Sequence, residues 1–220
     1  MRVLALLLVL AAPARAQLAV GFDVSAGPSL TSVGASGTVE AAGLPIPLGH
    51  VDIPAAVGVD ARVRLAVWGG PWGGRLGVGY LGASDVFDGA SVFQQRGVDL
   101  GFALASGELV YRHPVAFGAL GSGEVVAGLG PEVRVVLDEG TATDGLLALL
   151  GDVRQSHLAV GASLGARFRA GGLWLGPELR GGLALTPFSD DTVDAFGGAL
   201  RLAGDFRLHH VSLSLTLGVE

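Results

Sequence analysis

The feature that most constrains this chain is a hydrophobic residue at every second position, repeated along its 220 residues. Side chains on a β-strand point alternately to opposite faces, so this pattern predicts strands with one apolar and one polar face. Val125–Leu137 is apolar at every odd position, and Leu158–Phe168 at every even one. Nine segments show the alternation: residues 18–26, 57–67, 76–80, 98–104, 125–137, 158–168, 173–185, 196–206 and 211–219.

The length and the polar faces of these segments favour a membrane barrel. Most reach about 7 to 15 residues, whereas globular strands average about 5–6 and tilted membrane strands need about 9–11. Only 15% of the chain is charged, against about 25% in soluble domains. The polar faces carry Gly, Ser, Ala and isolated charges, which fits a narrow interior behind a lipid-facing apolar surface.

The sequence therefore predicts an all-β fold, an antiparallel up-and-down transmembrane β-barrel of 8 to 10 strands. The number stays open because single-chain bacterial barrels have an even number of strands. Residues 29–41 alternate weakly and could form a tenth strand, and Ser106-Gly107 and Gly204-Asp205 could each be a bulge or a turn. Short turns are expected at 69–73 and 170–172, and longer loops, several of them acidic, near 37–53, 85–96, 138–155 and 187–194.

The first sixteen residues have the organisation of a secretory signal. Arg2 precedes the apolar run Val3–Ala12, and Ala14-Arg15-Ala16 has the small-x-small pattern of a cleavage site. We expect cleavage after Ala16, with residues 17–220 as the barrel domain and the cell outer membrane as the destination. The chain has no cysteine, which excludes disulfides and thiolate sites, and its net charge of −6 argues against a nucleic-acid partner.

Taken together, the signal, the alternating strands and the rhythm of short turns and long loops make the chain resemble the small outer-membrane barrels of the OmpA/OmpX type. The resemblance implies a closed barrel with a charged, hydrogen-bonded core and a role in envelope integrity, adhesion or narrow permeation. Outer-membrane lipids, lipopolysaccharide and the assembly machinery would be its partners. The final strand, Leu213–Glu220, lacks the terminal aromatic usual in that family. The best candidates for an interfacial aromatic girdle are Trp68, Trp72, Tyr80, Tyr111 and Trp174.

A short repeat accompanies two of the strands. Gly130-Pro131-Glu132-Val133-Arg134 matches Gly176-Pro177-Glu178-Leu179-Arg180, and Ala26-Gly27-Pro28-Ser29-Leu30 is a fainter copy. Proline in a strand marks an edge or a bulge, so each copy is expected to bend its strand. Glu and Arg two residues apart share a face and could join a charge ladder across the lumen. The alternative is a coincidence within a biased composition.

Charged residues on the polar faces form the candidate site. They comprise Asp60, Arg62, Arg64, Glu124, Glu132, Arg134, Arg167, Arg169, Glu178, Arg180, Arg201, Asp205 and Arg207. In an eight-stranded barrel the interior is just wide enough for side chains to fill, so we expect Arg–carboxylate pairs to plug the lumen. The alternative is a narrow pore or small-solute transporter with an Arg-lined interior.

Two further functions receive less support from the sequence. His210 and Ser212 have the His-x-Ser spacing of certain outer-membrane lipid A deacylases, whose chemistry needs an imidazole beside the hydroxyl and a carboxylate to orient it. Leu213 stands where those enzymes have Asn, and Glu220 is the only acid nearby in sequence. A soluble periplasmic barrel with an apolar cavity is the other alternative. We expect no enzymatic activity, no cofactor and no metal, and the sequence leaves the oligomeric state open.

Overall fold

The computed structural model describes residues 18–41, 44–86, 98–118, 121–138, 156–187, 192–195 and 200–220. The predicted signal peptide and most of the predicted acidic loops lie outside these ranges. The described residues form no helix long and apolar enough to cross a membrane. Their strands are β1 (Leu18–Ala41), β2 (Leu44–Gly69), β3 (Trp72–Val86), β4 (Val98–Ala116), β5 (Ser122–Asp138), β6 (Ser156–Ala170), β7 (Leu173–Ala184), β8 (Thr192–Ala195) and β9 (Leu200–Val219).

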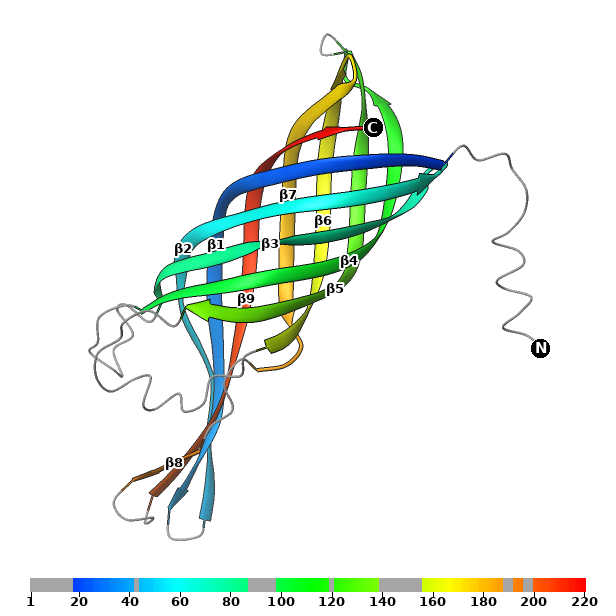
Figure 1. The fold of residues 1–220 in the computed structure, drawn as a ribbon. Coiled ribbons are helices and arrows are strands. Elements are labelled where there is room, and N and C mark those ends of the chain that lie inside the picture. Colours follow the sequence, from blue (N-terminus) through cyan, green and yellow to red (C-terminus); the bar gives the residue numbers. More distant parts are fainter. Residues whose placement is uncertain are drawn as a thin grey trace, which may run out of the picture.

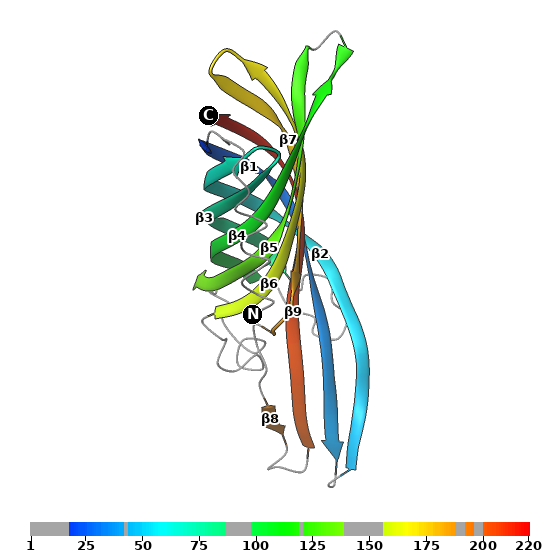
Figure 2. The same cartoon turned by 90° about the vertical axis from the view of Figure 1, so that its right-hand side faces the viewer.

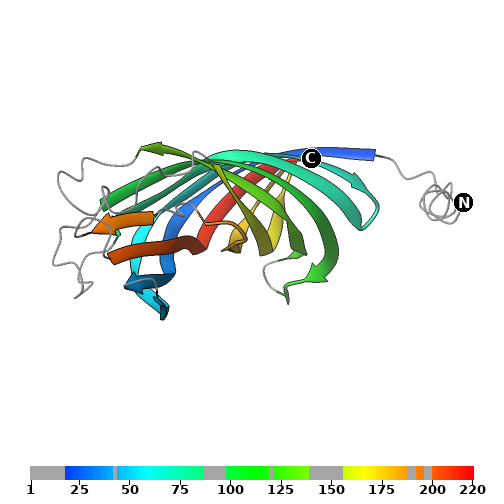
Figure 3. The same ribbon diagram turned by 90° about the horizontal axis from the view of Figure 1, so that it is seen from below.

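Eight of these strands close into a barrel. β1 to β7 and then β9 are neighbours in chain order, every pair is antiparallel, and a β1–β9 pairing completes the ring. The strands wind steeply around the barrel (Figure 1) and curl about a common interior when seen from below (Figure 3). β8 pairs only with the first residues of β9. The predicted all-β up-and-down barrel is confirmed, with a barrel of eight strands.

The sequence pattern divides the chain into more segments than the barrel has strands, because two long strands carry irregular alternation. Residues 200–206 of the predicted segment 196–206 are joined with the segment 211–219 in β9, and residues 196–199 lie outside the described part. Gly204-Asp205 lies within β9, opposite Ser36 and Gly37 of β1. Residues 29–41 are the second part of β1, so the possible tenth strand is wrong. The predicted loop at 37–53 is wrong as well, since most of it belongs to the β1–β2 hairpin.

Two tight connections lie at one end of the barrel, here called the short-turn end. β2 turns into β3 at Gly70-Pro71, and β6 into β7 at Gly171-Gly172, as the sequence predicts. Gly70 and Gly171 have φ of 71° and 66°, a backbone conformation that side chains with a Cβ rarely adopt. Leu18 pairs with Gly69, so the barrel begins at the same end. The opposite end is called the loop end.

At the loop end an arm projects beyond the other strands. It consists of residues 33–41, 44–56, 192–195 and 200–208, and Figure 2 shows β1, β2 and β9 running far past the barrel. β3 pairs with β2 only from Val57 onward, so the arm part of β2 has β1 on one side alone among the described residues. That part of β2 contains Pro45, Pro47 and Pro54.

The apolar faces of the strands point outward, as the membrane interpretation requires. In β9, Leu213, Leu215 and Leu217 are exposed, and they alternate with Ser212, Ser214 and Thr216, which are buried. β7 alternates in the same way along its length. A soluble barrel with an apolar cavity would need the reverse arrangement.

β4 departs from this rule. Leu100, Phe102 and Leu104 are buried in the interior, whereas Leu109 points outward. The register of β4 against β3 is unbroken from the pair of Ala83 with Leu100 to the pair of Trp72 with Tyr111. No bulge or turn therefore lies at Ser106-Gly107. The hydrophobic residues change face while the backbone continues, so assigning Leu100, Phe102 and Leu104 to the lipid side is wrong.

Candidate functional site

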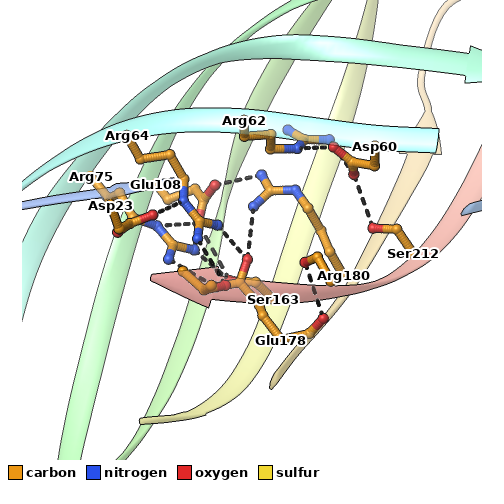
Figure 4. A network of polar contacts seen from close by, with 12 residues as sticks. Asp23, Asp60, Arg62, Arg64, Arg75, Glu108, Ser163, Glu178, Arg180 and Ser212 are labelled. Atoms are coloured by element: carbon orange, nitrogen blue, oxygen red, sulfur yellow. Dashed lines mark hydrogen bonds and ion pairs between the residues drawn. The ribbon is translucent and has the colours of Figure 1, made fainter. Parts of the chain in front are cut away.

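The interior of the barrel holds a dense set of buried charges. Eight of the predicted residues are buried there: Asp60, Arg62, Arg64, Glu132, Arg134, Arg167, Glu178 and Arg180. Three more buried charges, Asp23, Arg75 and Glu108, belong to the same set. These eleven residues are called the lumen network, and Figure 4 shows most of it. Alternation brings them together, because the inward positions of several strands meet in one narrow space.

Arg62 connects two separate strands. Its Nε lies 2.7 Å from Oδ1 of Asp60 on the same strand, β2. Its Nη1 reaches Oε2 of Glu132 on β5 at 2.6 Å. Glu132 in turn pairs through Oε1 with Nε of Arg134 at 2.8 Å. β2 and β5 are three places apart around the ring, so this chain of ion pairs crosses the lumen.

Glu178 on β7 receives arginines from the other side of the barrel. Arg64 Nη1 contacts its Oε1, and Arg75 Nη1 lies 3.1 Å from its Oε2. Arg64 also holds Asp23 of β1, with Nε 2.5 Å from Oδ1. β3, which carries Arg75, is four places from β7 in a ring of eight. The Arg75–Glu178 pair therefore joins opposite walls.

Glu108 on β4 is a second point where arginines meet. Arg75 Nη2 lies 2.5 Å from its Oε2, and Arg180 Nη2 lies 2.5 Å from its Oε1. Arg75 Nη2 also donates to Ser163 Oγ at 2.8 Å. Arg75 thus links β3 with β4, β6 and β7. Nε and Nη1 of Arg180 have no hydrogen-bond partner among the described residues.

The His-x-Ser pair lies in the interior and lacks the geometry of a nucleophile and its base. His210 and Ser212 are both buried, and Ser212 Oγ donates to Asp60 Oδ2 at 2.9 Å. Nδ1 of His210 lies 2.8 Å from Arg134 Nη2. A guanidinium can only donate, so this nitrogen must accept a hydrogen bond. The hydroxyl is held by a carboxylate, and neither group faces the outer wall where a lipid would lie.

Five of the predicted residues do not join the lumen network. Glu124 and Arg169 lie at the short-turn end, where Glu124 Oε1 is 4.0 Å from Arg112 and Arg169 contacts Glu220. Asp205 is half-buried and Arg207 is exposed in the loop-end arm. Arg201 is placed by register opposite Glu40 and Asp194, and its side chain lies outside the described part. Alternation placed Glu124 and Arg169 correctly on the inward faces of their strands. It could not show that they lie at the end of the barrel and not in the middle of the lumen.

Asp23, Arg75 and Glu108 were missed for different reasons. Asp23 and Arg75 alternate with outward residues such as Phe22 and Leu76, so the face pattern could have found both. Glu108 lies beyond the point where hydrophobic residues of β4 change face, and this hid its direction.

Buried apolar side chains lie on both sides of the network. Toward the short-turn end, Ala66, Trp68, Val110 and Val126 form a packed cluster. Toward the loop end, Leu81, Phe102 and Leu208 are fully buried. Trp68 and Trp174 are therefore interior residues, and their assignment to the aromatic girdle is wrong. Trp72, Tyr80 and Tyr111 do lie on the exposed face.

The Gly-Pro repeat marks interruptions in strand pairing. The β4–β5 ladder skips from Ser106–Glu132 to Leu109–Leu129, and thus passes over Gly130-Pro131. The β6–β7 ladder skips Gly176-Pro177 in the same way, and the β1–β9 ladder skips Gly27-Pro28. Proline has no N–H to donate, which explains the gaps. In the first two copies, the Glu and Arg that follow the proline (Glu132 and Arg134, Glu178 and Arg180) point together into the lumen.

No group of three or more His, Asp or Glu residues that could hold a metal ion occurs among the described ranges. The arginines already occupy the carboxylate oxygens at 2.5–3.1 Å in several pairs. Within the described part of the chain, the arrangement thus supports cross-linking of the barrel walls.

The fold is similar to solved outer-membrane barrels. The outer membrane protein OprG from Pseudomonas aeruginosa aligns with 92% of this chain and 97% of its own, at 12% identity and a TM-score of 0.52. Neisserial surface protein A aligns over 89% of this chain and 97% of its own, at 10% identity and a TM-score of 0.46. No protein-family model and no curated protein matches the sequence. At this identity the likeness to OprG establishes the fold alone, the small outer-membrane barrel that the sequence pattern resembles.

Proposed function

We propose that the chain is an integral outer-membrane protein whose lumen is closed, and that it acts in the envelope as a structural or interaction protein. Export would use residues 1–16, with cleavage after Ala16. Its partners would be the surrounding lipids and lipopolysaccharide, together with the machinery that inserts barrels. The outward apolar faces support the membrane location, because they would otherwise face water.

The observation that carries the proposal is the pairing of Arg75 with Glu178 across the barrel. A water-filled channel needs a continuous open path along the lumen. The Arg75–Glu178 pair joins opposite walls in the middle of the lumen and so blocks such a path. Removing charge from water is costly unless each charge finds a partner. The short distances and the buried apolar layers on both sides support a lumen filled by side chains.

The experiment is a planar-bilayer recording of the purified protein. We expect no steady current above that of the bare membrane. If a current appears, Arg207→Gln is the matched control for substitutions of lumen arginines, since it removes an exposed arginine outside the lumen network. Steady conductance from the unmodified protein would overturn the closed-lumen proposal. In parallel, heat-dependent mobility of the outer-membrane fraction on SDS gels tests the location, and recovery in the soluble periplasm would contradict it.

A narrow pore remains the second candidate, supported by one observation. The lumen network contains six arginines and five carboxylates, a surplus of one positive charge. Its nearly complete pairing leaves less preference for anions than an Arg-lined wall would have. If conductance is found, substitution of Arg134 and Arg180 should reduce it, and unchanged current in both variants would exclude this pathway.

A further inference from the structure

The short-turn end of the lumen contains a small pocket, away from the ion pairs that close the middle of the lumen. Its volume is about 190 Å³, and its lining includes Glu124, Arg167, Arg169, Trp174 and Glu220. All five are inward positions on β5, β6, β7 or the end of the chain after β9. The pocket is therefore the mouth of the lumen and is separated from the outer wall.

Arg167 forms the inner part of the pocket and is incompletely paired. It is 6% exposed, and its guanidinium carbon lies 3.7 Å from the ring centroid of Trp174. Nη2 has no hydrogen-bond partner among the described residues, and it lies 3.7 Å from Oδ2 of Asp23. An arginine carries five N–H donors and cannot lose its charge. A buried guanidinium with a spare donor favours an additional anionic acceptor.

Arg169 supplies a second guanidinium two residues along the same strand, and hence on the same face. Its side chain is 58% exposed, and Nη2 lies 3.1 Å from Oε2 of Glu220. Glu220 Oε1 lies 2.5 Å from Arg112 Nη1. A carboxylate of the chain itself thus already bridges two arginines at this mouth, so these guanidiniums can hold an oxyanion.

We propose that this pocket binds a small oxyanion between Arg167 and Arg169, with inorganic phosphate as the test ligand. Guanidinium groups match the oxygens of phosphate and carboxylate in paired, charge-assisted hydrogen bonds. At the mouth, Arg112 and Arg169 pair with Glu124 and Glu220. The ion pair of Arg167 with Asp23 is long, at 3.7 Å, and its Nη2 lacks a hydrogen-bond partner among the described residues, so this guanidinium can take a further oxyanion. Glu220 acts as a built-in competitor, because it occupies Arg169 and repels a second anion.

The test titrates the purified full chain in detergent with sodium phosphate, and sodium chloride keeps the ionic strength constant. Tryptophan fluorescence reports binding because Trp174 contacts Arg167 directly. We expect a saturable change with phosphate and none with chloride alone. Arg169→Gln should weaken binding by about tenfold through loss of a charge-assisted contact, whereas Glu220→Gln should strengthen it.

Arg169 is largely exposed, so its variant should keep the barrel, and a retained heat shift on SDS gels verifies this. Arg207→Gln, which removes an exposed arginine in the loop-end arm, is the matched control and should bind like the unmodified protein. An equal response to chloride and phosphate would overturn the proposal. Phosphate affinity unchanged by both Arg169→Gln and Glu220→Gln would overturn it as well.

Discussion

The middle of the lumen and its short-turn mouth use the same chemistry, arginine against carboxylate, under different conditions. In the middle, the side chains of Arg64, Arg75 and Glu132 are fully buried, and the pairs join strands on different sides of the ring. At the mouth, side-chain exposure rises to 18% for Arg112, 25% for Glu124 and 58% for Arg169. Because the pairing chemistry is the same in both regions, comparing them shows how much burial adds to the stability that an ion pair provides.

Burial should decide how much each pair matters. Removing one partner of a buried pair leaves an uncompensated charge at a cost of about 3–5 kcal/mol. An exposed pair typically contributes about 0–1 kcal/mol, because water and salt screen it. The middle pairs are therefore expected to hold the barrel together, and the mouth pairs leave room for exchange with other anions.

The largest effect is expected for Glu178→Gln. It leaves Arg64 and Arg75 without their shared carboxylate, and should lower the free energy of unfolding by about 3–5 kcal/mol. The measurement is urea unfolding in lipid vesicles, followed by gel mobility. The double variant Glu178→Gln with Arg64→Gln should lose less than the sum of the single variants, since it removes an interacting pair. Additive losses would contradict direct coupling.

An intermediate effect is expected at the interrupted ladders. A Cβ added at Gly176 would lie 1.7 Å from the carbonyl oxygen of Ala166, so the strands must move apart. Gly176→Ala should destabilise the barrel by about 1–3 kcal/mol. Gly74→Ala is the matched control, because nothing lies within 4 Å of its added Cβ. Equal unfolding midpoints for the two variants would show that the close approach is unimportant.

The smallest effect is expected for Arg169→Gln, which removes an exposed ion pair with Glu220. Its unfolding free energy should fall by no more than about 1 kcal/mol, and the difference should shrink at high salt. Unfolding at low and high sodium chloride measures both. A loss as large as that of Glu178→Gln would break the comparison between the two regions.

The sequence predicted the fold class and most of the buried charges because alternation is a local property. A strand such as β9 shows its faces through Leu213, Ser214 and Leu215 without reference to its neighbours. The repeated Gly-Pro-Glu-x-Arg segments also carried real information, since each copy places its ion pair beside a gap in the ladder. The residues Glu132, Arg134, Glu178 and Arg180 followed from that pattern.

Other features depend on the closed barrel and could not be read locally. β4 points Phe102 inward and Leu109 outward, so hydrophobicity alone misassigned its first part and hid Glu108. Residue type alone suggested that Trp68 and Trp174 belong to an aromatic girdle. Both occupy inward positions that alternate with the outward residues of their strands. The level of a residue along the barrel axis depends on register, and this is why Arg169 and Arg207 were grouped with the middle of the lumen.

The proline-bearing side of the loop-end arm has a consequence for self-association. Among the described residues, the part of β2 beyond β3 has an unpaired outer edge, and such an edge can template pairing with a second chain. Proline is tolerated in an edge strand where its nitrogen faces away from the sheet, and that nitrogen offers no hydrogen to an incoming strand. Pro45, Pro47 and Pro54 should thus let the arm project from the barrel while discouraging the growth of intermolecular sheets.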